Sequence, residues 1–216
     1  MNRVQIIEKI IYALDETLSL DEDNKAITEY ALYNVFVTVS IISGLSLVSL
    51  LLGVLPLAFI TLFSGAAFRW SMGGAHYSTP SRCIVISIMG PVAIAGLASY
   101  VSRLRTFTAP SPLVGIVLVL LIFACAIIHL YCPGETENNP LPDTRKPQLR
   151  RISYITLILW LVLMIYLLRL NHVSQILASC LALARQLLSV TPVGYRLFGL
   201  IDMMLSFLES PLKRRR

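Results

Sequence analysis

The stretch RWSMGGAHYSTPSRC, residues 69–83, gathers the most reactive side chains of a chain that is otherwise rich in apolar residues. His76 and Cys83 lie seven residues apart, with Pro80 between them. A cysteine acts as a nucleophile through its thiolate, and an imidazole can take up a proton near neutral pH. The two residues therefore predict a cysteine nucleophile that is served by a histidine general base.

The residues around Cys83 predict the start of a helix. Ser78 or Thr79 followed by Pro80 is typical of such a start, because a hydroxyl caps free amides and proline is tolerated in the first turn. Cys83 would then lie in the first turn or just beyond it, where the positive end of the helix and Arg82 favour negative charge. Exposed amides of the first turn could also receive an oxyanion.

A bend must bring His76 close to Cys83. In a continuous helix the two residues would be about 10 Å apart along the axis, which is too far for proton transfer. Gly73 and Gly74 permit a bend that other residues adopt less readily, so we expect His76 to fold back within hydrogen-bond reach of Cys83. Singly, a cysteine in a membrane helix is usually a packing residue, and a histidine near an interface usually makes amphipathic contacts. Their combination in one Gly-rich loop favours catalysis.

The composition places these residues in a membrane protein. Of the 216 residues, 56% are hydrophobic and 14% are charged, and the mean hydropathy is +0.74. Soluble domains carry about 25% charged residues. Because lipid offers backbone amides no partner, the spans must be helices. We therefore expect an all-α polytopic membrane helix bundle that forms a single integral-membrane domain, residues 1–216.

Six membrane segments are predicted from apolar runs of the required length. The segment at 56–68 is short and relies on Arg69 and Trp70 at headgroup level, and the segment at 176–190 carries Arg185. A count of four is therefore the alternative. The six predicted segments are 32–53, 56–68, 84–101, 113–131, 154–168 and 176–190.

The basic residues predict the orientation, since positively charged loops stay in the cytoplasm. With the N-terminus inside and six spans, only Arg103, Arg105 and Arg169 fall outside. The loop at 69–83 then faces the cytoplasm of a multi-pass cell-membrane protein. The net charge of +6 follows this topology, and we expect no nucleic-acid partner. The terminal KRRR is expected to contact membrane lipids, with docking of an acidic peptide as the alternative.

The N-terminal segment, residues 1–30, begins with an amphipathic pattern. Over residues 1–20, apolar residues recur at three- and four-residue spacing, and charged residues occupy the other face. This pattern predicts a helix on the membrane surface. Its role is either anchoring and packing or docking of an amphipathic substrate. The apolar positions are Val4, Ile7, Ile11, Leu14 and Leu18.

Arg69, Gly74, His76 and Cys83 in this spacing, followed much later by the basic loop NPLPDTRKPQLRR, resemble the accessory gene regulator B family of membrane cysteine endopeptidases. The similarity covers most of the chain. It implies a thiol protease that processes a quorum-sensing precursor peptide in Gram-positive bacteria. By the pattern of that family Cys83 is the nucleophile and His76 its general base, no cofactor or metal is required, and a homodimer is plausible.

The resemblance also implies a reaction sequence. The Cys83 thiolate attacks the carbonyl at the C-terminal side of the future signal, releases an acidic tail and retains the signal as a thioester. An internal cysteine or serine of the substrate then closes a thiolactone or lactone. A site at the bilayer edge suits this cyclisation, because limited water slows hydrolysis while the tethered nucleophile acts at high effective concentration.

Supporting residues follow from the motif and from its surroundings. Arg69 either pairs with a substrate carboxylate or contacts lipid headgroups. The basic loop at 132–152, with Arg145 and Lys146, either holds the acidic tail or is an ordinary positively charged cytoplasmic loop. A third catalytic residue is not identified, and Ser78 or a backbone carbonyl is a candidate to orient His76. The full set of supporting residues is Arg69, Gly73, Gly74, Ser78, Arg82, Arg145 and Lys146.

Two other classes of function compete with a peptidase. Cys125, His129 and Cys132 share one helix face and include metal-binding side chains, although packing is the simpler interpretation of three ligands on one helix. The second class is a small transporter or peptide exporter, which several spans with small residues such as Gly90 would suit. Against it, the spans hold almost no ionisable residues. A transporter would not need the Cys83 thiol.

Overall fold

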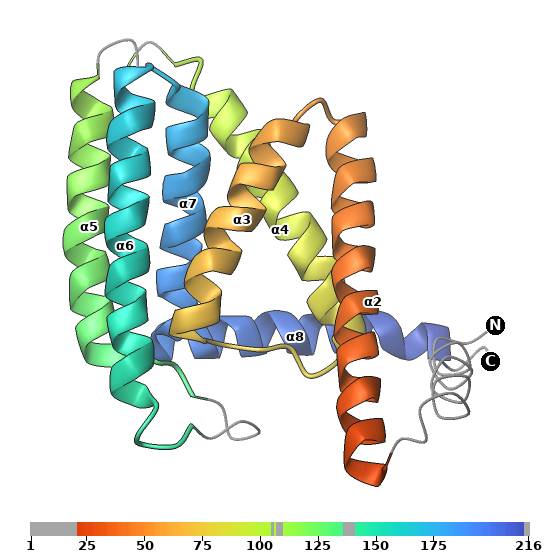
Figure 1. Cartoon of the computed structure of the whole chain (residues 1–216). Helices are drawn as coiled ribbons and strands as arrows, with labels where there is room; N and C mark the ends of the chain where they lie inside the picture. Colours follow the sequence, from red (N-terminus) through yellow and green to blue (C-terminus); the bar gives the residue numbers. More distant parts are fainter. Residues whose placement is uncertain (1–20, 105, 107–109, 136–140, 214–216) are drawn as a thin grey trace. The chain divides into compact units, whose positions relative to one another are not determined.

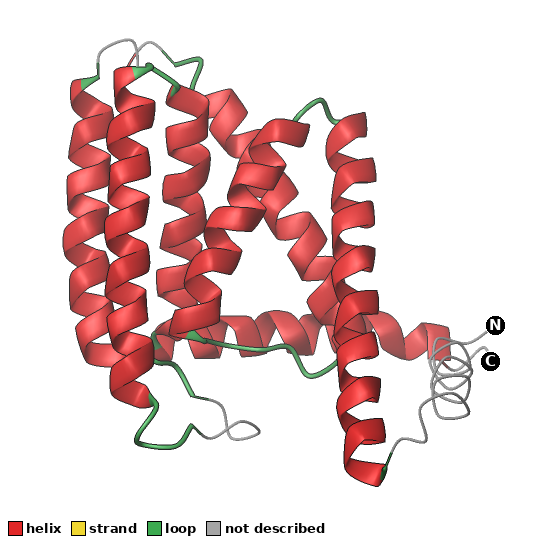
Figure 2. Cartoon of the chain, in the orientation of Figure 1, coloured by secondary structure: helices red, strands yellow, loops and turns green. Residues whose placement is uncertain are grey.

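The structure is a computed structural model that describes residues 21–213 except 105, 107–109 and 136–140. The described residues form helices joined by loops, without a strand (Figure 2). This architecture confirms the expected all-α polytopic bundle. The helices are α2 (Glu22–Leu51), α3 (Leu55–Met72), α4 (Pro80–Val101), α5 (Ser111–Tyr131), α6 (Lys146–Arg169), α7 (Val173–Val190) and α8 (Pro192–Lys213).

The helices α2 to α7 are each long and apolar enough to cross a membrane, which confirms the predicted six spans. All six extend beyond the predicted segments at one end or at both, and α2 begins at Glu22 rather than at residue 32. α3 continues to Met72 because Arg69 and Trp70 still fit a helix, and the chain leaves it only at Gly73, where φ is 68°. α6 begins at Lys146 rather than near residue 154, since polar residues tolerate the first turns of a helix that enters a bilayer.

The chain divides into two compact units, residues 1–44 and 45–216. In the first unit the structure describes residues 21–44, which belong to α2. The Asp21 carboxylate accepts a hydrogen bond of 2.8 Å from the Asn24 amide and so caps this helix. The amphipathic helix predicted for residues 1–20 lies outside the described residues. All further description concerns the second unit.

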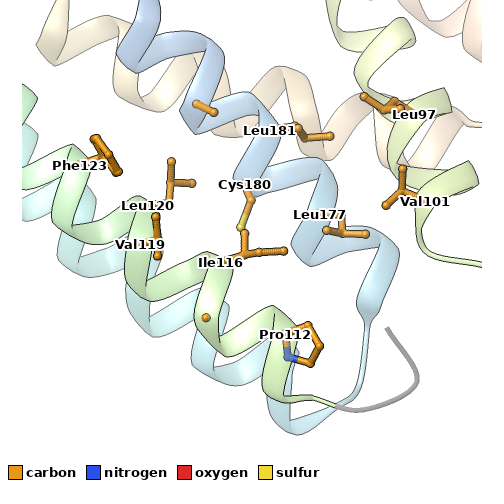
Figure 3. A pocket seen from close by; sticks show the side chains of 12 residues that line it. Leu97, Val101, Pro112, Ile116, Val119, Leu120, Phe123, Leu177, Cys180 and Leu181 are labelled. Carbon is orange, nitrogen blue, oxygen red and sulfur yellow. The ribbon is translucent and has the colours of Figure 1, made fainter. Parts of the chain in front are cut away.

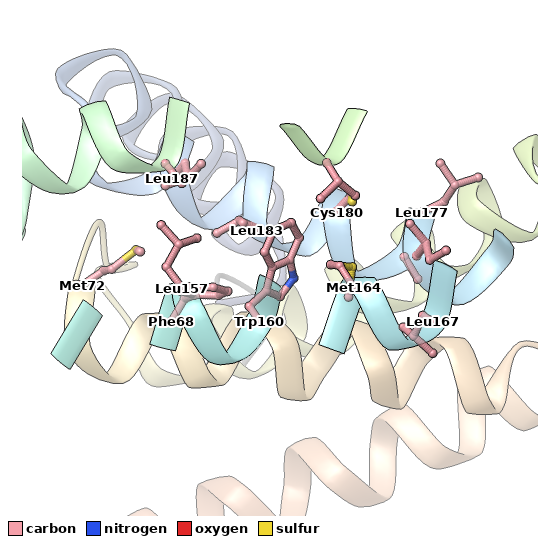
Figure 4. Packing of buried hydrophobic residues seen from close by; sticks show 14 of the residues in the cluster. Phe68, Met72, Leu157, Trp160, Met164, Leu167, Leu177, Cys180, Leu183 and Leu187 are labelled. Atoms are coloured by element: carbon pink, nitrogen blue, oxygen red, sulfur yellow. The ribbon is translucent and has the colours of Figure 1, made fainter. Parts of the chain in front are cut away.

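α7 is the central helix of the second unit. It packs against α3, α4, α5, α6 and α8, and it is the most buried of the candidate spans. Leu183 of α7 belongs to an apolar cluster with Phe68 and Trp160, whose rings meet edge to face at 6.4 Å (Figure 4). The Ser179 hydroxyl lies 2.9 Å from the hydroxyl of Ser64 and accepts a 2.9 Å bond from the Trp160 indole. Polar side chains of α7 therefore face protein rather than lipid, as a polar residue within a bilayer requires.

An apolar cavity of about 600 Å³ lies between α4, α5 and α7 (Figure 3). It is lined by residues such as Val101 at the end of α4 and Pro112 at the start of α5. Cys83 is near the opposite end of α4, roughly 27 Å away along a helix of this length. The cavity is therefore not part of the loop at 73–79 between α3 and α4, which carries His76 and is called the site loop below. Its lining is Leu97, Val101, Pro112, Gly115, Ile116, Val119, Leu120, Phe123, Leu177, Cys180, Leu181 and Ala184.

The last helix, α8, differs from the six candidate spans. It runs across the ends of α3 and α7 at the end of the bundle where residues 73–79 lie (Figure 1). Large apolar side chains recur at three- and four-residue spacing and are exposed along one face of α8. Such a helix is typical of the membrane interface. The exposed stripe consists of Val193, Leu197, Leu200, Met204 and Phe207.

Candidate active site

Gly73 and Gly74 turn the chain out of α3, as the sequence predicted. Both adopt positive φ, 68° and 119°, which other residues rarely adopt. The surroundings also exclude a side chain. A Cβ on Gly73 would lie 2.5 Å from the Gly134 carbonyl oxygen, and one on Gly74 would lie 2.6 Å from the Ser189 hydroxyl. Close approach of three backbone segments thus explains both glycines.

Hydrogen bonds hold the loop after α3 on both sides. The Gly134 amide donates to the Met72 carbonyl at 2.7 Å, which joins this loop to the loop after α5. The Ala75 amide donates to the Ser189 carbonyl at 3.0 Å, and the Gln186 side-chain amide donates to the Gly73 carbonyl at 2.9 Å. The loop that carries His76 is therefore attached to α7 by its backbone.

His76 is held by Arg69, one of the residues that the motif singled out. The Arg69 guanidinium donates to the Ala75 carbonyl at 2.8 Å and lies 3.3 Å from Nδ1 of His76. A guanidinium has no acceptor atom, so Nδ1 must be the unprotonated nitrogen of the ring. Arg69 thus fixes both the position and the tautomer of the exposed imidazole.

The same environment keeps the imidazole neutral. Partial desolvation lowers the pKa of His76 below its usual value, and the positive charge of Arg69 lowers it further. A histidine with a lowered pKa is uncharged at neutral pH and retains a lone pair that can accept a proton. The ring is therefore in the form that a general base needs.

Cys83 is the fourth residue of α4 and is half-buried with a free thiol. Pro80 begins the helix, and Thr79 has the extended backbone of an N-cap, so the predicted helix start is confirmed. The predicted hydroxyl cap is not formed, because the Thr79 hydroxyl is buried without a hydrogen-bond partner among the described atoms. The Cys83 amide donates to the Thr79 carbonyl at 3.1 Å and is not available to an oxyanion.

Two charged side chains act on Cys83. The Cys83 sulfur lies within electrostatic range of the guanidiniums of Arg69 from α3 and Arg185 from α7. The expected hydrogen bond between His76 and Cys83 is not present among the described contacts, since Nδ1 faces Arg69 instead. Catalytic hydrogen bonds are often long or unformed before substrate binds. Nucleophile and base thus share one arginine rather than a direct bond.

Arg82 connects the site loop to α8 rather than to the thiol. Its guanidinium donates to the Ser78 hydroxyl at 2.9 Å and forms a 3.2 Å ion pair with Asp202. The Ser78 amide also donates to the Asp202 carboxylate at 3.2 Å, and the rings of Tyr77 and Phe198 pack at 5.9 Å. Ser78 was a candidate to orient His76, but its hydroxyl and its amide are bonded to Arg82 and to Asp202 of α8 instead.

The surroundings of Asp202 favour the ionised form of its carboxyl group. Partial desolvation acts to raise the pKa of Asp202, but hydrogen bonds from Ser78 and Arg82 and the charge of Arg82 outweigh it, and the net effect is a lowered pKa. Asp202 lies more than 100 residues after the loop, so sequence spacing could not reveal the contact. Its only sequence feature is a carboxylate within a largely apolar helix, one of two acidic residues in α8.

The basic segment at 132–152 lies at the same end of the bundle, but it is not all loop as predicted, because residues from Lys146 onward form the first turns of α6. Its charges are also unequal. Lys146 forms ion pairs with Glu135 at 2.5 Å and with Asp143 at 2.9 Å, so its positive charge is compensated by two carboxylates of this chain. Arg150 donates to the Cys132 carbonyl at 3.0 Å, whereas Arg145 is exposed. Glu137, Asn138 and Asn139 of this segment lie outside the described residues.

The side chains considered for metal binding are separated by burial. Cys125 and His129 are exposed, whereas Cys132 is buried, and burial raises the pKa of the Cys132 thiol to about 12. Among the described residues, no three His, Cys, Asp or Glu side chains are grouped as metal ligands. His172 precedes α7 at the end of the bundle opposite the site loop (Figure 1).

Fold and site together define a polytopic all-α membrane protein in which His76 and Cys83 lie at one end of the helix bundle. Residues 7–191 match the family described as Accessory gene regulator B, and the chain belongs to this family. Family membership assigns it a role in the accessory gene regulator system.

Two relatives show how far the similarity extends. An AgrB-like protein of Clostridium perfringens strain SM101 is 25% identical over 193 residues, which cover 86% of this chain and 89% of the relative. AgrB-like protein 2 of Clostridium perfringens strain 13 is 23% identical over 210 residues, which cover 92% and 96%. No solved structure matches this chain.

Proposed function

We propose that this protein is a membrane cysteine endopeptidase that cleaves a quorum-sensing precursor peptide, with Cys83 as nucleophile and His76 as general base. The supporting observation is that one arginine, Arg69, is bonded to His76 and also acts electrostatically on Cys83. The base and the nucleophile therefore belong to one charged site. Family membership supports the same assignment.

The first step moves a proton from the Cys83 thiol to His76. Nδ1 carries the free lone pair of the ring, and Arg69 occupies it at rest through a contact of 3.3 Å. Arg69 also holds the Ala75 carbonyl through the shorter bond of 2.8 Å. Substrate binding would let the guanidinium release Nδ1 while it keeps Ala75, and the thiol would take its place.

The second step breaks the peptide bond. The thiolate attacks the scissile carbonyl, so that a bond forms between Sγ and carbon and the carbon–nitrogen bond breaks. The proton on His76 passes to the leaving amine, as in other cysteine–histidine peptidases. The N-terminal part of the substrate remains on Cys83 as a thioester.

A nucleophile within the substrate completes the reaction. An internal thiol or hydroxyl attacks the thioester and gives a thiolactone or a lactone, which regenerates the Cys83 thiol. The tether gives this group a high effective concentration. The membrane interface beside the loop and α8 would limit the water that competes with it.

We also propose that the end of the bundle that carries the site faces the cytoplasm. Arg82, Arg145, Arg150 and Arg151 lie at that end, whereas Arg103 and Arg169 follow the helix ends on the other side. Excess positive charge stays in the cytoplasm. The precursor peptide would then meet the site before any export.

The test is co-expression of the chain with a candidate precursor, and the measurement is precursor cleavage and adduct mass. We expect Cys83→Ala to abolish cleavage and His76→Ala to slow it about 100-fold or more, since general-base catalysis contributes that much. Cys83→Ser would retain binding with little turnover. A substrate adduct on Cys83 should be recovered from the wild-type protein.

Cys125→Ala is the matched control, because Cys125 is an exposed thiol on α5 away from the loop. It should cleave the precursor at the wild-type rate. Full processing by Cys83→Ala would contradict the peptidase and favour a transporter, which has no need of this thiol.

A further inference from the structure

Arg185 is a partly buried charged residue near the end of α7 that contacts the loop of His76, and sequence and motif assign it no role. It belongs to the central helix α7 and lies within a candidate membrane span. Its guanidinium packs over Gly90 of α4, where an added Cβ would lie 3.2 Å from the guanidinium carbon. Gly90 follows Cys83 by seven residues, so both residues lie on the same face of α4.

Arg185 has no anionic partner within the described part of the protein. The helices α3 to α7 contain no Asp or Glu. In the second unit the carboxylates whose side chains the structure describes are bound elsewhere: Asp202 to Arg82, and both Glu135 and Asp143 to Lys146. No hydrogen bond or ion pair to Arg185 occurs among the described residues, in contrast to Arg82, which is paired.

An unpaired guanidinium in a membrane span is costly, and such residues usually mark a functional site. Arg69 adds to the cost here, because it acts on Arg185 as a like charge. Tyr77 and Cys83 also lie within electrostatic range of Arg185, and the Tyr77 phenol can donate a hydrogen bond. An anion bound at the Arg185 guanidinium would therefore be stabilised by two cations and could accept a hydrogen bond from Tyr77.

We propose that Arg185 binds a carboxylate of the peptide substrate and so determines which precursors are cleaved. The seven residues between Cys83 and Gly90 correspond to about 10 Å along α4. An extended peptide covers this distance in about three residues. The carboxylate would therefore belong to a residue about three positions from the scissile carbonyl.

Position favours a peptide over a lipid as the source of the anion. Arg185 points from the most buried span toward α4 and the site loop, whereas lipid headgroups surround the outside of the bundle. Its contact with Gly90 places the guanidinium on the face of α4 that also carries Cys83. The assignment rests on the proposed peptidase function, because the ligand is the peptide bound at Cys83.

The experiment is a double-mutant cycle in liposomes with the full chain and the precursor peptide that the wild-type protein processes. Each Asp and Glu within four residues of the cleavage site is changed singly to the corresponding amide, and each peptide is tested on wild type and Arg185→Gln. We expect Arg185→Gln to lower kcat/KM at least ten-fold, mainly through KM, because charge-assisted bonds to carboxylates are strong. One amide peptide should show the same loss on wild type and no further loss on Arg185→Gln.

Three variants make the outcome specific. Arg185→Lys should retain part of the preference for the acidic peptide, and Arg185→Glu should prefer a peptide with Lys at that position. Arg169→Gln removes an exposed arginine at the other end of the bundle and should behave as wild type. Additive losses for every peptide would overturn the proposal. The proposal would also be overturned if the loss of kcat/KM in Arg185→Gln depended on whether the liposomes contain phosphatidylglycerol or phosphatidylcholine and did not depend on the peptide.

A binding measurement separates this proposal from the proposed function. Fluorescence anisotropy of the labelled precursor on Cys83→Ala reports the Arg185 contact without any cleavage. Cleavage that does not depend on Cys83 would refute the proposed peptidase. If the Cys83→Ala, Arg185→Gln double variant then still lost binding of the acidic peptide alone, the carboxylate site would be supported. Unchanged anisotropy with Cys83-dependent cleavage would refute the carboxylate site alone.

Discussion

At the residue scale, Arg69 has two functions in one place. It donates to Nδ1 of His76 and thereby selects the tautomer, and its charge helps to lower the pKa of the ring. Desolvation is the larger cause of the lowered pKa. The unprotonated ring is the active form of a base, so a lowered pKa extends activity toward acidic pH.

Arg69→Gln should therefore move the acidic limb of the rate profile upward. Loss of the charge lets the pKa of His76 rise toward its usual value, but desolvation remains, so we expect the limb to move toward higher pH without reaching the position of a fully solvated imidazole. The measurement is kcat/KM for precursor cleavage between pH 5 and 8. Arg69→Lys keeps the charge and should leave the limb near its wild-type position. A limb that stays in place in Arg69→Gln would show that Arg69 does not act on His76.

The sequence predicted the local structure of the candidate site better than its contacts. The helix start before Cys83 and the bend at the two glycines are confirmed, because both are local features, whereas the catalytic roles of His76 and Cys83 stay a prediction. The Arg69–His76 contact was not foreseen, since Arg69 was expected to meet substrate or headgroups. The pairing of Arg82 with Asp202 and the packing of Arg185 over Gly90 join segments about 95 to 120 residues apart, as their numbers show, and one sequence holds no record of such contacts.

At the element scale, α8 supports the site loop. The Arg82–Asp202 ion pair and the Tyr77–Phe198 ring contact attach α8 to the loop and the start of α4. Both charged side chains are largely buried, with 10% and 18% of their surface exposed. Removal of one partner from such a pair leaves the other without compensation, which costs more than the pair contributes.

Asp202→Asn should loosen α8 and reduce cleavage about ten-fold, because Arg82 and Ser78 lose their anionic partner. The measurement is precursor cleavage together with limited proteolysis within α8. Because the pKa of Asp202 is lowered in the folded protein, the ion pair stabilises above the unfolded pKa and is lost as the pH falls through the folded value. The wild-type protein should therefore approach the variant only in strong acid. Asp143→Asn, at an exposed pair, is the control, and equal effects of the two changes would contradict a special role for α8.

Membrane spans were easier to predict than α8. Long apolar runs indicate spans without any tertiary information, whereas the ends of α3 and α6 depend on polar residues that tolerate the interface. In α8 the apolar stripe alternates with Arg196, Gly199 and Asp202, so no long apolar run marks the helix. Its position across the bundle follows from contacts that only the fold supplies.

At the scale of the whole molecule, the two ends of the second unit differ. One end carries the site loop, the basic loop and α8, whereas the apolar cavity is located toward the other end (Figures 1 and 3). Arginine and lysine are concentrated at the site end. This asymmetry is a topological feature, because the excess of positive charge sets orientation in the bilayer.

Cysteine labelling should show that the site end faces the cytoplasm. Thr144→Cys and His172→Cys lie at exposed positions of opposite ends, and both are introduced after the native cysteines have been replaced by serine. An impermeant maleimide added to intact cells should label His172→Cys and spare Thr144→Cys until the cells are lysed. The reverse pattern would place the site outside and would remove the proposed access of a cytoplasmic precursor.

The contact between Gly73, Gly74 and Gly134 holds the loop after α3 against the loop after α5. The Gly134 amide is bonded to the Met72 carbonyl, and each glycine lacks the room for a side chain. A substrate that displaced the backbone at Gly134 would therefore also displace the backbone that presents His76. Contact with the loop after α5 and alignment of the imidazole would then be coupled.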